Sequence, residues 1–326
     1  MAKQDFRSAH HIYIIALGGN AIIPAGKRGT YDEQLLLTRE TMEQVAVLAE
    51  NGNQIVLTHG NGPVVGNIVL RNDAGLEKHG IPRMPLYVCG ADSQGGIGFM
   101  IQQALQNALR ARKLQRAVVA LVTQVVVDQN DPAFANPTKP IGPFYDAQQA
   151  RALEREHGWV VVEDANRGWR RVVPSPSPKE VVEVAAIRAL TTAGIITIAA
   201  GGGGVPVVRD EKGELSGVAA VIDKDRASAL LGQLIRADCL ILITSIDCVY
   251  LRFGQPDQHP LRTLDTREAS RWLEEGEFSP GSMGPKIESA LAFLAGGGQE
   301  VIITNPTSIL AAIEGRAGTR IIPVHN

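Results

Sequence analysis

Three lysines of this sequence stand where a cation is out of place. Lys139 lies in a proline-rich segment, Lys224 stands between two aspartates, and Lys286 follows a Gly-Pro turn at the start of a helix pattern. The helix dipole disfavours a lysine at a helix start. A lysine is most often a solvated bystander. The positions of these three make sense if each faces a bound polyphosphate.

A second candidate feature is the stretch 196–228. An apolar strand pattern leads into Gly201-Gly-Gly-Gly, and about twenty residues later Asp223-Lys-Asp opens an amphipathic helix pattern. Glycine adopts φ > 0 and lets a ligand approach the backbone closely. A helix N-terminus attracts anions. Two interpretations fit these residues equally: an anion site, or a flexible hairpin followed by an aspartate-capped helix.

Two further glycine loops follow predicted strands. Gly18, Gly19 and Asn20 follow the first, and Gly60-Asn61-Gly62 follows the second, ahead of a proline suited to a helix start. Each loop alone is explained equally well as a tight turn. Three such junctions, counting 201–204, favour converging backbone N–H groups that bind an anion.

The sequence motifs of the two common nucleotide-binding folds are absent. The sequence has neither G-x-x-x-x-G-K-[ST] nor G-x-G-x-x-G, which disfavours a P-loop enzyme and a Rossmann dehydrogenase. His59 is the one histidine in a suggestive loop, and a structural role is the favoured interpretation. The segment 244–250 ends a strand pattern. Its polar groups either hold a base or ribose, or Asp247 caps a turn.

The composition is that of a soluble globular enzyme. The 326 residues are 44% hydrophobic and 20% charged, with a net charge of −2, so nothing suggests nucleic acid as a partner. The three cysteines form no C-x-x-C pair, which fits a reducing compartment. No apolar run approaches the ~18 residues of a membrane span. We therefore expect a cytoplasmic enzyme that does not enter the membrane.

Strand and helix patterns alternate along the chain. Mostly apolar strands separated by helices predict a parallel sheet covered on both faces, an α/β fold whose ligands bind at the carboxyl ends of the strands. The predicted strands are 12–17, 54–58, 117–127, 195–200, 239–244 and 300–304. The predicted helices are 32–50, 63–78, 92–113, 179–192, 225–236, 266–275 and 285–295, with a short helix from 306.

The segment 128–178 interrupts this alternation. It is dense in proline and contains a helical patch at 146–156. A featureless loop of this length is unusual in a compact domain, so we expect a small subdomain. A further division near 194–200 suggests two lobes in one domain (1–326): a substrate lobe of about 1–194 that includes the subdomain, and a nucleotide lobe of about 195–326.

Together these motifs resemble the carbamate kinases of the amino-acid kinase superfamily. The resemblance is carried nearly end to end by the glycine loops, by Gly201–Pro206 and by Pro280-Gly-Ser-Met-Gly-Pro-Lys. Its most specific parts are Asn136-Pro-Thr-Lys-Pro-Ile-Gly-Pro-Phe and Val221-Ile-Asp-Lys-Asp. It implies an open three-layer αβα sandwich around a mainly parallel sheet, a protruding subdomain near 128–178, and a homodimer.

The resemblance also implies a reaction, in which ATP and carbamate interconvert with ADP and carbamoyl phosphate. ATP formation in catabolism of arginine and related compounds is its usual direction. The catalytic residues implied are Lys139, Lys224, Asp225 and Lys286. The implied substrate loops contain Gly18, Gly19, Asn20, Gly60, Asn61 and Gly62. Nucleotide contacts are implied for Gly202, Gly203, Thr244, Asp247, Tyr250, Met283 and Gly284.

The proposed chemistry needs cations more than it needs a base. Carbamate is already an oxyanion, so the task is to bring two anions together and to spread charge over the transferring oxygens. We expect Mg²⁺ to ride on the ATP or ADP phosphates and no dedicated metal ligands in the protein. Related acid kinases have a lysine where this chain has Asn20, and Lys139 would take over that charge. Two alternatives stay open: a kinase for another carboxylate or amino acid, and a non-catalytic nucleotide-binding regulator.

Overall fold

The computed structural model describes residues 11–19, 22, 29–163 and 168–324. Its central sheet has eight strands, in which β16 and β17 run antiparallel and the other described neighbours run parallel. In order across the sheet the strands are β15 (Thr263–Asp265), β17 (Thr319–Ile322), β16 (Glu300–Thr304), β12 (Cys239–Ile243), β1 (Ile12–Leu17), β2 (Gln54–His59), β9 (Ile196–Ile198) and β3 (Val118–Ala120).

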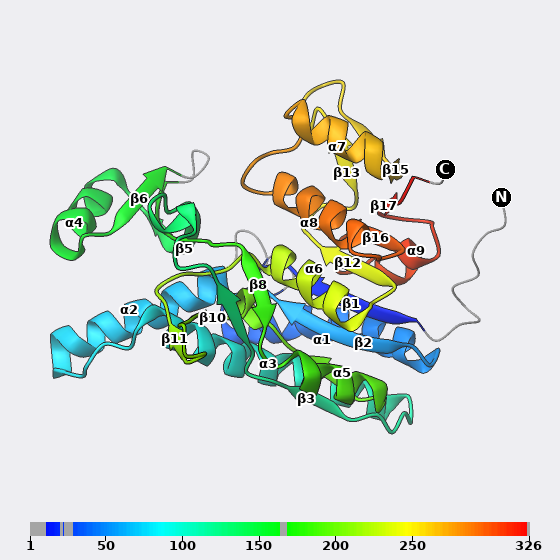
Figure 1. The fold of residues 1–326 in the computed structure, drawn as a ribbon, viewed down its shortest axis with the longest axis horizontal. Helices are drawn as coiled ribbons and strands as arrows, with labels where there is room; N and C mark the ends of the chain where they lie inside the picture. The colour runs from blue at the N-terminus through cyan, green and yellow to red at the C-terminus, as the bar shows by residue number, and fades with distance from the viewer. Residues whose placement is uncertain (1–10, 20–21, 23–28, 164–167, 325–326) are drawn as a thin grey trace.

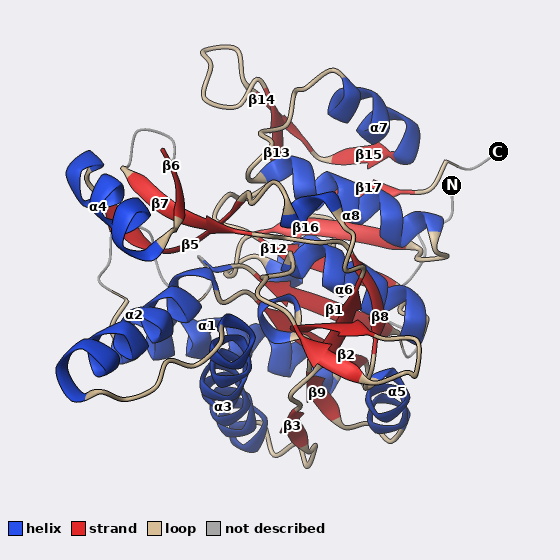
Figure 2. Cartoon of the chain, turned by 60° about the vertical axis from the view of Figure 1, so that its left-hand side comes forward, coloured by secondary structure: helices blue, strands red, loops and turns tan. Residues whose placement is uncertain are grey.

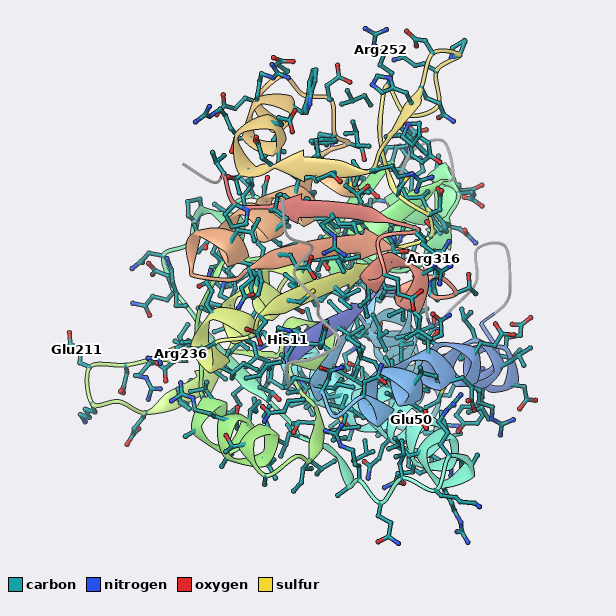
Figure 3. All side chains as sticks on the ribbon, turned by 90° about the vertical axis from the view of Figure 1, so that its right-hand side faces the viewer. His11, Glu50, Glu211, Arg236, Arg252 and Arg316 are labelled. Carbon is teal, nitrogen blue, oxygen red and sulfur yellow. The ribbon has the colours of Figure 1, made fainter. Side chains whose placement is uncertain are left out.

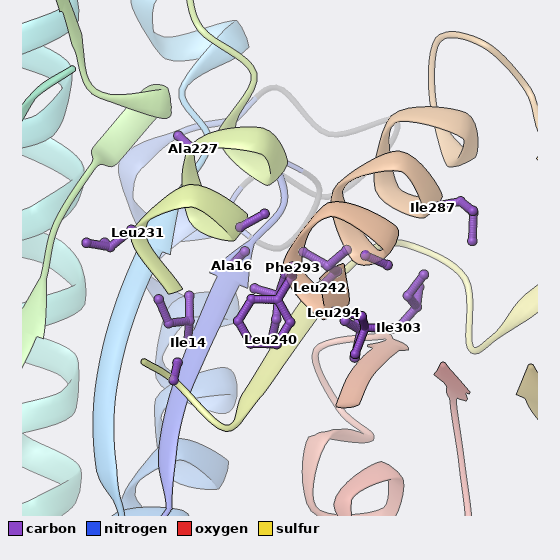
Figure 4. Packing of buried hydrophobic residues seen from close by; sticks show 14 of the residues in the cluster. Ile14, Ala16, Ala227, Leu231, Leu240, Leu242, Ile287, Phe293, Leu294 and Ile303 are labelled. Carbon is purple, nitrogen blue, oxygen red and sulfur yellow. The ribbon is translucent and has the colours of Figure 1, made fainter. Parts of the chain in front are cut away.

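Alternate side chains of the central strands feed two hydrophobic cores, one on each face of the sheet. On β1, Tyr13, Ile15 and Leu17 join one core, and Ile14 and Ala16 join the other. The first core is covered by α1 (Tyr31–Glu50), α3 (Leu86–Ala111) and α9 (Ile309–Ile313). The second is covered by α5 (Val184–Thr192), α6 (Lys224–Ile235), α7 (Thr266–Glu274) and α8 (Met283–Ala295), and part of it is drawn in Figure 4. The predicted three-layer sandwich is confirmed.

The predicted subdomain is present and protrudes from the sandwich. It consists of an antiparallel sheet in the order β5 (Lys139–Tyr145), β7 (Trp169–Val173) and β6 (Val160–Glu163), with α4 (Ala147–His157) against it. Figures 1 and 2 show it reaching out beside α2 (Gly62–His79). A short 3₁₀ turn, Pro132–Phe134, leads into the subdomain.

A second, smaller sheet corrects two of the predicted elements. Its order is β11 (Leu215–Gly217), β10 (Val205–Arg209), β4 (Gln124–Val127) and β8 (Pro178–Val181). The single strand predicted over 117–127 is wrong, because the chain leaves the central sheet after β3 and enters this one at β4. Between the two strands, the side-chain amide of Gln94 donates a hydrogen bond to the Thr123 carbonyl and accepts one from the Thr123 N–H.

The helix predicted over 179–192 is also partly wrong. Residues 178–181 form β8, in which Val181 pairs with Val125, and the helix α5 begins only at Val184. Pairing with a buried strand outweighs the local helical pattern here. The helix predicted over 92–113 starts earlier, at Leu86 after Pro85. A two-stranded hairpin, β13 (Val249–Leu251) and β14 (His259–Leu261), completes the fold. None of the described helices has both the length and the apolar character needed to cross a membrane.

Candidate active site

Lys224 and Lys286 lie at the N-termini of two packed helices and share one carboxylate. Lys224 is the first residue of α6, and Lys286 lies in the first turn of α8. The Lys224 ammonium pairs with Asp225 Oδ1, and Lys286 Nζ donates to Asp225 Oδ2 at 2.7 Å. All three residues are buried. The cluster therefore keeps a net positive charge at two helix N-termini, an arrangement suited to an anion.

Lys139 reaches the same helix from the protruding subdomain. It is the first residue of β5, and its Nζ pairs with Asp223 Oδ2 at 2.5 Å. Asp223 Oδ1 caps α6 by accepting hydrogen bonds from the backbone N–H groups of Asp225 (2.9 Å) and Arg226 (3.3 Å). One carboxylate thus ties the subdomain to the helix that presents Lys224.

Gly18 and Gly60 allow two strand ends to lie against the side chain of Lys224. A Cβ at Gly60 would stand 3.3 Å from Lys224 Cδ, and one at Gly18 would stand 4.0 Å from Lys224 Cε and 2.6 Å from the carbonyl oxygen of Ile243. Any larger residue would displace the lysine or the end of β12. The structure therefore brings the glycine loops after β1 and β2 against Lys224. Gly19 lies beside them, since a Cβ at Gly60 would stand 3.5 Å from the Gly19 nitrogen.

The third glycine loop, 201–204, packs against Asn61 and the backbone of Ile222. A Cβ at Gly202 would stand 2.2 Å from Asn61 Nδ2, and one at Gly203 would stand 2.3 Å from the carbonyl oxygen of Ile222. Asn61 Nδ2 donates to Ser93 Oγ at 2.7 Å. Gly62 opens α2 next to the subdomain, where a Cβ would stand 3.9 Å from the Pro140 carbonyl oxygen. The structure thus brings Gly202 against the loop predicted to bind substrate. Asn20, also predicted for that loop, lies outside the described residues.

Burial and ion pairing act in opposite directions on the pKa values of this cluster. Burial, aided by Lys286 and opposed by Asp225, lowers the pKa of Lys224 to about 8. Burial also acts to lower the pKa of Lys286. The neighbouring groups, led by the carboxylate of Asp225, outweigh burial, so the pKa of Lys286 is raised. Burial opposes ionisation of Asp223 and Asp225, yet the adjacent lysines hold the pKa of each below its usual value. Both carboxylates are thus ionised at neutral pH.

A cavity of about 600 Å³ opens beside the cluster, between the end of β12, the β13–β14 hairpin and the start of α8. This volume is typical of a small-molecule site. Arg252 and the exposed Phe253 line it, and Arg252 lies at the edge of the molecule in Figure 3. Met283 lines the cavity three residues before Lys286 on α8, so both lie on one helix face. The larger lining residues are Thr244, Ile246, Tyr250, Phe253, Phe278 and Met283.

The predicted nucleotide residues divide into two groups. Thr244, Tyr250 and Met283 line this cavity, and Asp247 accepts a hydrogen bond from the Tyr250 hydroxyl at 2.8 Å. Gly284 lies in the turn into α8, where its N–H donates to the Ser279 carbonyl oxygen at 2.9 Å. Gly202 and Gly203 are not among the residues that line the cavity.

His59 has the structural role favoured from the sequence. It is buried, and burial lowers its pKa to about 4, so the imidazole is neutral. A Cβ at Gly201 would stand 2.3 Å from its Nε2, which shows how tightly the ring is packed. Within the described ranges, no three metal-ligating side chains gather at one point.

Sequence reasoning missed Asp223 as a site residue and the aromatic walls of the cavity. Asp223 stood in the Asp-Lys-Asp pattern, but its partner Lys139 lies 84 positions away and is brought near only by the fold. Phe253 and Phe278 lie in loops without a motif, and the sequence offers no signal for them.

Comparisons with known proteins agree with this fold. The family model described as "Amino acid kinase family" matches residues 11–305. The carbamate kinase of Pyrococcus horikoshii is 51% identical over 310 residues, which cover 95% of this chain and 98% of that protein. The carbamate kinase of Giardia lamblia bound to citric acid is 41% identical, with a TM-score of 0.91 and coverage of 97% and 99%. The same Giardia enzyme bound to AMP-PNP has a TM-score of 0.88, with the same identity and coverage.

The chain therefore belongs to the amino acid kinase family. Within that family it belongs to the carbamate kinases, because relatives that match it at 48–51% identity over nearly their full length carry that name. The family resemblance found in the motifs is confirmed.

Proposed function

We propose that this chain catalyses the reversible transfer of a phosphoryl group between ATP and carbamate, with ADP and carbamoyl phosphate as the other pair. The observation that carries the proposal is the buried cluster of Lys224, Lys286 and Asp225, which stands against the glycine loops after β1 and β2. The names of the relatives, and the AMP-PNP in the Giardia structure, support the same assignment.

The lysines would act by stabilising charge. A lysine about 4 Å from a phosphoryl oxygen contributes roughly 4 kcal/mol at an effective dielectric of about 20. Lys224 and Lys286 would contact the transferring group and the nucleotide phosphates, and Asp225 would hold them in place. Lys139 would leave Asp223 for the phosphoryl group. Gly18, Gly19 and Gly60 would let the carbamoyl end approach the backbone, and Asn20 would complete this loop.

The cavity beside α8 is the proposed adenine and ribose site. Thr244, Tyr250 and Met283 line it, and Asp247 orients the Tyr250 hydroxyl. Phosphates that extend from it along α8 would reach Lys286 one turn later. Gly202 and Gly203 would contribute indirectly, because Gly202 packs on Asn61.

The residues fit Mg²⁺ that enters with the nucleotide. Asp223 and Asp225, the carboxylates beside the lysines, both accept hydrogen bonds from lysines and so are engaged. Mg²⁺ prefers oxygen ligands and keeps several waters, and the nucleotide phosphates supply such oxygens. The bound ion would neutralise charge on the phosphates, while the lysines and loops orient the two anions.

The direct test mixes the purified protein with carbamoyl phosphate and MgADP and detects ATP by light emission. The expected result is ATP formation far above that of the Lys224→Ala variant, because the variant lacks a buried cation at the proposed site. ATP at the level of this variant would contradict the proposal. A screen of acetate, glutamate and aspartate as acceptors with MgATP separates carbamate from other carboxylates, and we expect carbamate to be preferred.

Three further parts of the proposal concern the direction of the reaction, the oligomeric state and the location in the cell. We infer that the reaction runs toward ATP in catabolism, that the protein is a homodimer, and that it acts in the cytoplasm. All three rest on the family resemblance. Sedimentation at micromolar concentration should give a mass near twice the 34.9 kDa of one chain, and a single-chain mass would contradict the dimer.

A further inference from the structure

A second cavity, of about 420 Å³, lies at the base of the protruding subdomain. One wall comes from α2 and the loop after it, and the other from the end of α4 and from β6 and β7, elements that lie close together in Figure 2. Val69, Leu86 and Val173 give it apolar surface. None of its lining residues belongs to the proposed active site.

Arg171 brings to this cavity a guanidinium that forms no ion pair with a carboxylate of the described residues. Its guanidinium lies over the ring of Trp159, 4.3 Å from the ring centroid. Among the residues that the structure describes, none accepts a hydrogen bond from it. The nearby Asp73 forms its ion pair with Arg83, with Nε and Oδ1 2.7 Å apart. Burial lowers the pKa of Arg171, which means that desolvation outweighs the attraction of Asp73.

The stacked geometry leaves the hydrogen-bond donors of Arg171 available. Stacking on an aromatic ring uses the face of the guanidinium, whereas its N–H groups point outward in the plane. Those groups match the two oxygens of a carboxylate or phosphate. The apolar wall formed by Val69, Leu86 and Val173 suits a planar or aliphatic body beside that anionic group.

We propose that this cavity is a second ligand site, and that it takes a small organic anion whose carboxylate or phosphate group pairs with Arg171. The volume falls in the range of small-molecule sites, and a few polar groups in an apolar surround are their usual lining.

The position of the cavity couples it to Lys139. Val173 lines the cavity and is the register partner of Lys139 across β7 and β5. Pro137, two residues before Lys139, lines it as well. A ligand held between β7 and α2 therefore bears on the strand pair that carries Lys139, and its occupancy changes the rate of phosphoryl transfer. Only this effect on rate rests on the proposed function, and binding does not.

Trp159 provides a direct reporter of binding. The chain has three tryptophans, so a Trp169→Phe/Trp272→Phe variant leaves Trp159 alone. The probes are benzoate and phenyl phosphate, which separate the two anion chemistries, and benzamide as the neutral counterpart. We expect a saturable change in Trp159 emission with at least one anion and no such change with benzamide.

Substitutions then assign the binding to Arg171. Arg171→Met should weaken it about tenfold or more, the usual effect of losing a charge-assisted hydrogen bond, and Arg171→Lys should weaken it less. Arg155→Gln removes an equal charge from the exposed face of α4 outside this cavity and should leave affinity unchanged. Lys224→Ala should also leave affinity unchanged, since it alters the active site alone. Circular dichroism confirms that each variant is folded.

Several results would overturn the proposal. They are no saturable change with either anion, an equal change with benzamide, equal affinity in the Arg171→Met and Arg155→Gln variants, or loss of binding in Lys224→Ala. A saturating anion should also alter ATP formation in the parent protein and not in Arg171→Met. An unaltered rate would overturn the coupling. If the protein makes no ATP at all, the proposed function fails, while the fluorescence result still decides the second site.

Discussion

At the scale of single residues, Asp223 joins the two parts of the proposed site. One of its oxygens caps α6, and the other holds Lys139. A phosphoryl group would compete with Asp223 for Lys139, so the ion pair describes a resting arrangement in which the lysine is stored beside its target. Under the proposed function, the residue therefore has both a structural and a functional contribution, and substitutions can separate the two.

Asp223→Asn should separate them. Asparagine caps a helix about as well as aspartate, so the change in the cap alone should alter stability by less than about 1 kcal/mol. The neutral amide no longer pairs with Lys139, and kcat for ATP formation should fall about tenfold. Asp265→Asn makes the same change at the cap of α7, away from the site, and should leave kcat unaltered. Equal kcat in both variants would remove Asp223 from the mechanism.

Lys224 predicts the pH dependence of activity. Its pKa in the folded protein is about 8, and only the ammonium form attracts the phosphoryl group. For carbamoyl phosphate, kcat/KM should therefore fall as the pH rises through about 8. Lys224→Arg keeps its charge over this range, so its profile should lack that alkaline fall. An identical profile in the variant would show that another group titrates.

Stability should respond to this lysine with the opposite sign. Between about pH 8 and the ordinary value of 10.5, the unfolded chain holds a proton that the folded chain has lost. Lys224 therefore makes the folded state relatively more stable as the pH rises across this interval. A comparison of chemical denaturation with Lys224→Arg isolates this contribution and separates loss of activity from unfolding.

At the scale of elements, the contact between α2 and β5 sets the position of the subdomain. A Cβ at Gly66 of α2 would stand 2.0 Å from Gly142 Cα and 2.2 Å from the Gly142 nitrogen in β5. Backbone therefore touches backbone at this point, three residues along the chain from Lys139. Under the proposed function, this close approach fixes the position from which Lys139 would act.

Gly66→Ala should push the two elements apart. Alanine is the better helix former, but the clash with β5 should cost about 1–3 kcal/mol and move Lys139. We expect kcat to fall at least tenfold in a protein that still folds. Gly75→Ala on the same helix meets its nearest neighbour at 3.7 Å and should be neutral or stabilising. Full activity in Gly66→Ala would show that the subdomain tolerates the shift.

The elements also show what local sequence could and could not predict. The period of apolar residues located α1, α6 and α8 to within two residues, because each buries one continuous face in a core. The same reasoning failed at 117–127 and 178–181, where pairing with β10 and β4 decides the conformation. The lysines stood out because a cation is disfavoured at a helix start, and the glycine loops stood out because each follows a predicted strand. The Lys139–Asp223 pair depends on a contact that only the fold creates.

At the scale of the whole molecule, the proposed site lies where the strand order of the central sheet reverses. From β1 the chain continues to β2 on one side, and β12 is added later on the other, so the loops after β1 and β2 and the start of α6 meet at this switch point. Lys139, Lys224 and Lys286 come from separate parts of the sequence. The core beneath Lys224 and Lys286 holds α6 and α8 together, and Phe293 packs in it (Figure 4).

Substitution of one phenylalanine in the core and one at the cavity should affect different properties of the protein. Phe293 is fully buried, and a Cβ at Gly232 would stand 2.6 Å from its ring, so Phe293→Ala should cost about 3–5 kcal/mol in urea denaturation. Phe253 is 61% exposed at the cavity, so Phe253→Ala should leave stability within about 0.5 kcal/mol and weaken ADP binding. Unchanged ADP affinity in a calorimetric titration of Phe253→Ala would argue against this cavity as the nucleotide site.

The central claim is that three lysines from distant parts of the chain act on one transferring phosphoryl group. A crystal structure with MgADP, carbamate and aluminium fluoride tests it most directly, since the fluoride occupies the place of that group. The account predicts that Lys139 has left Asp223 and that Lys139, Lys224 and Lys286 all lie within about 4 Å of the fluoride, the separation at which each contributes appreciably. A fluoride bound elsewhere, or one bound here while Lys139 stays paired with Asp223, would contradict it.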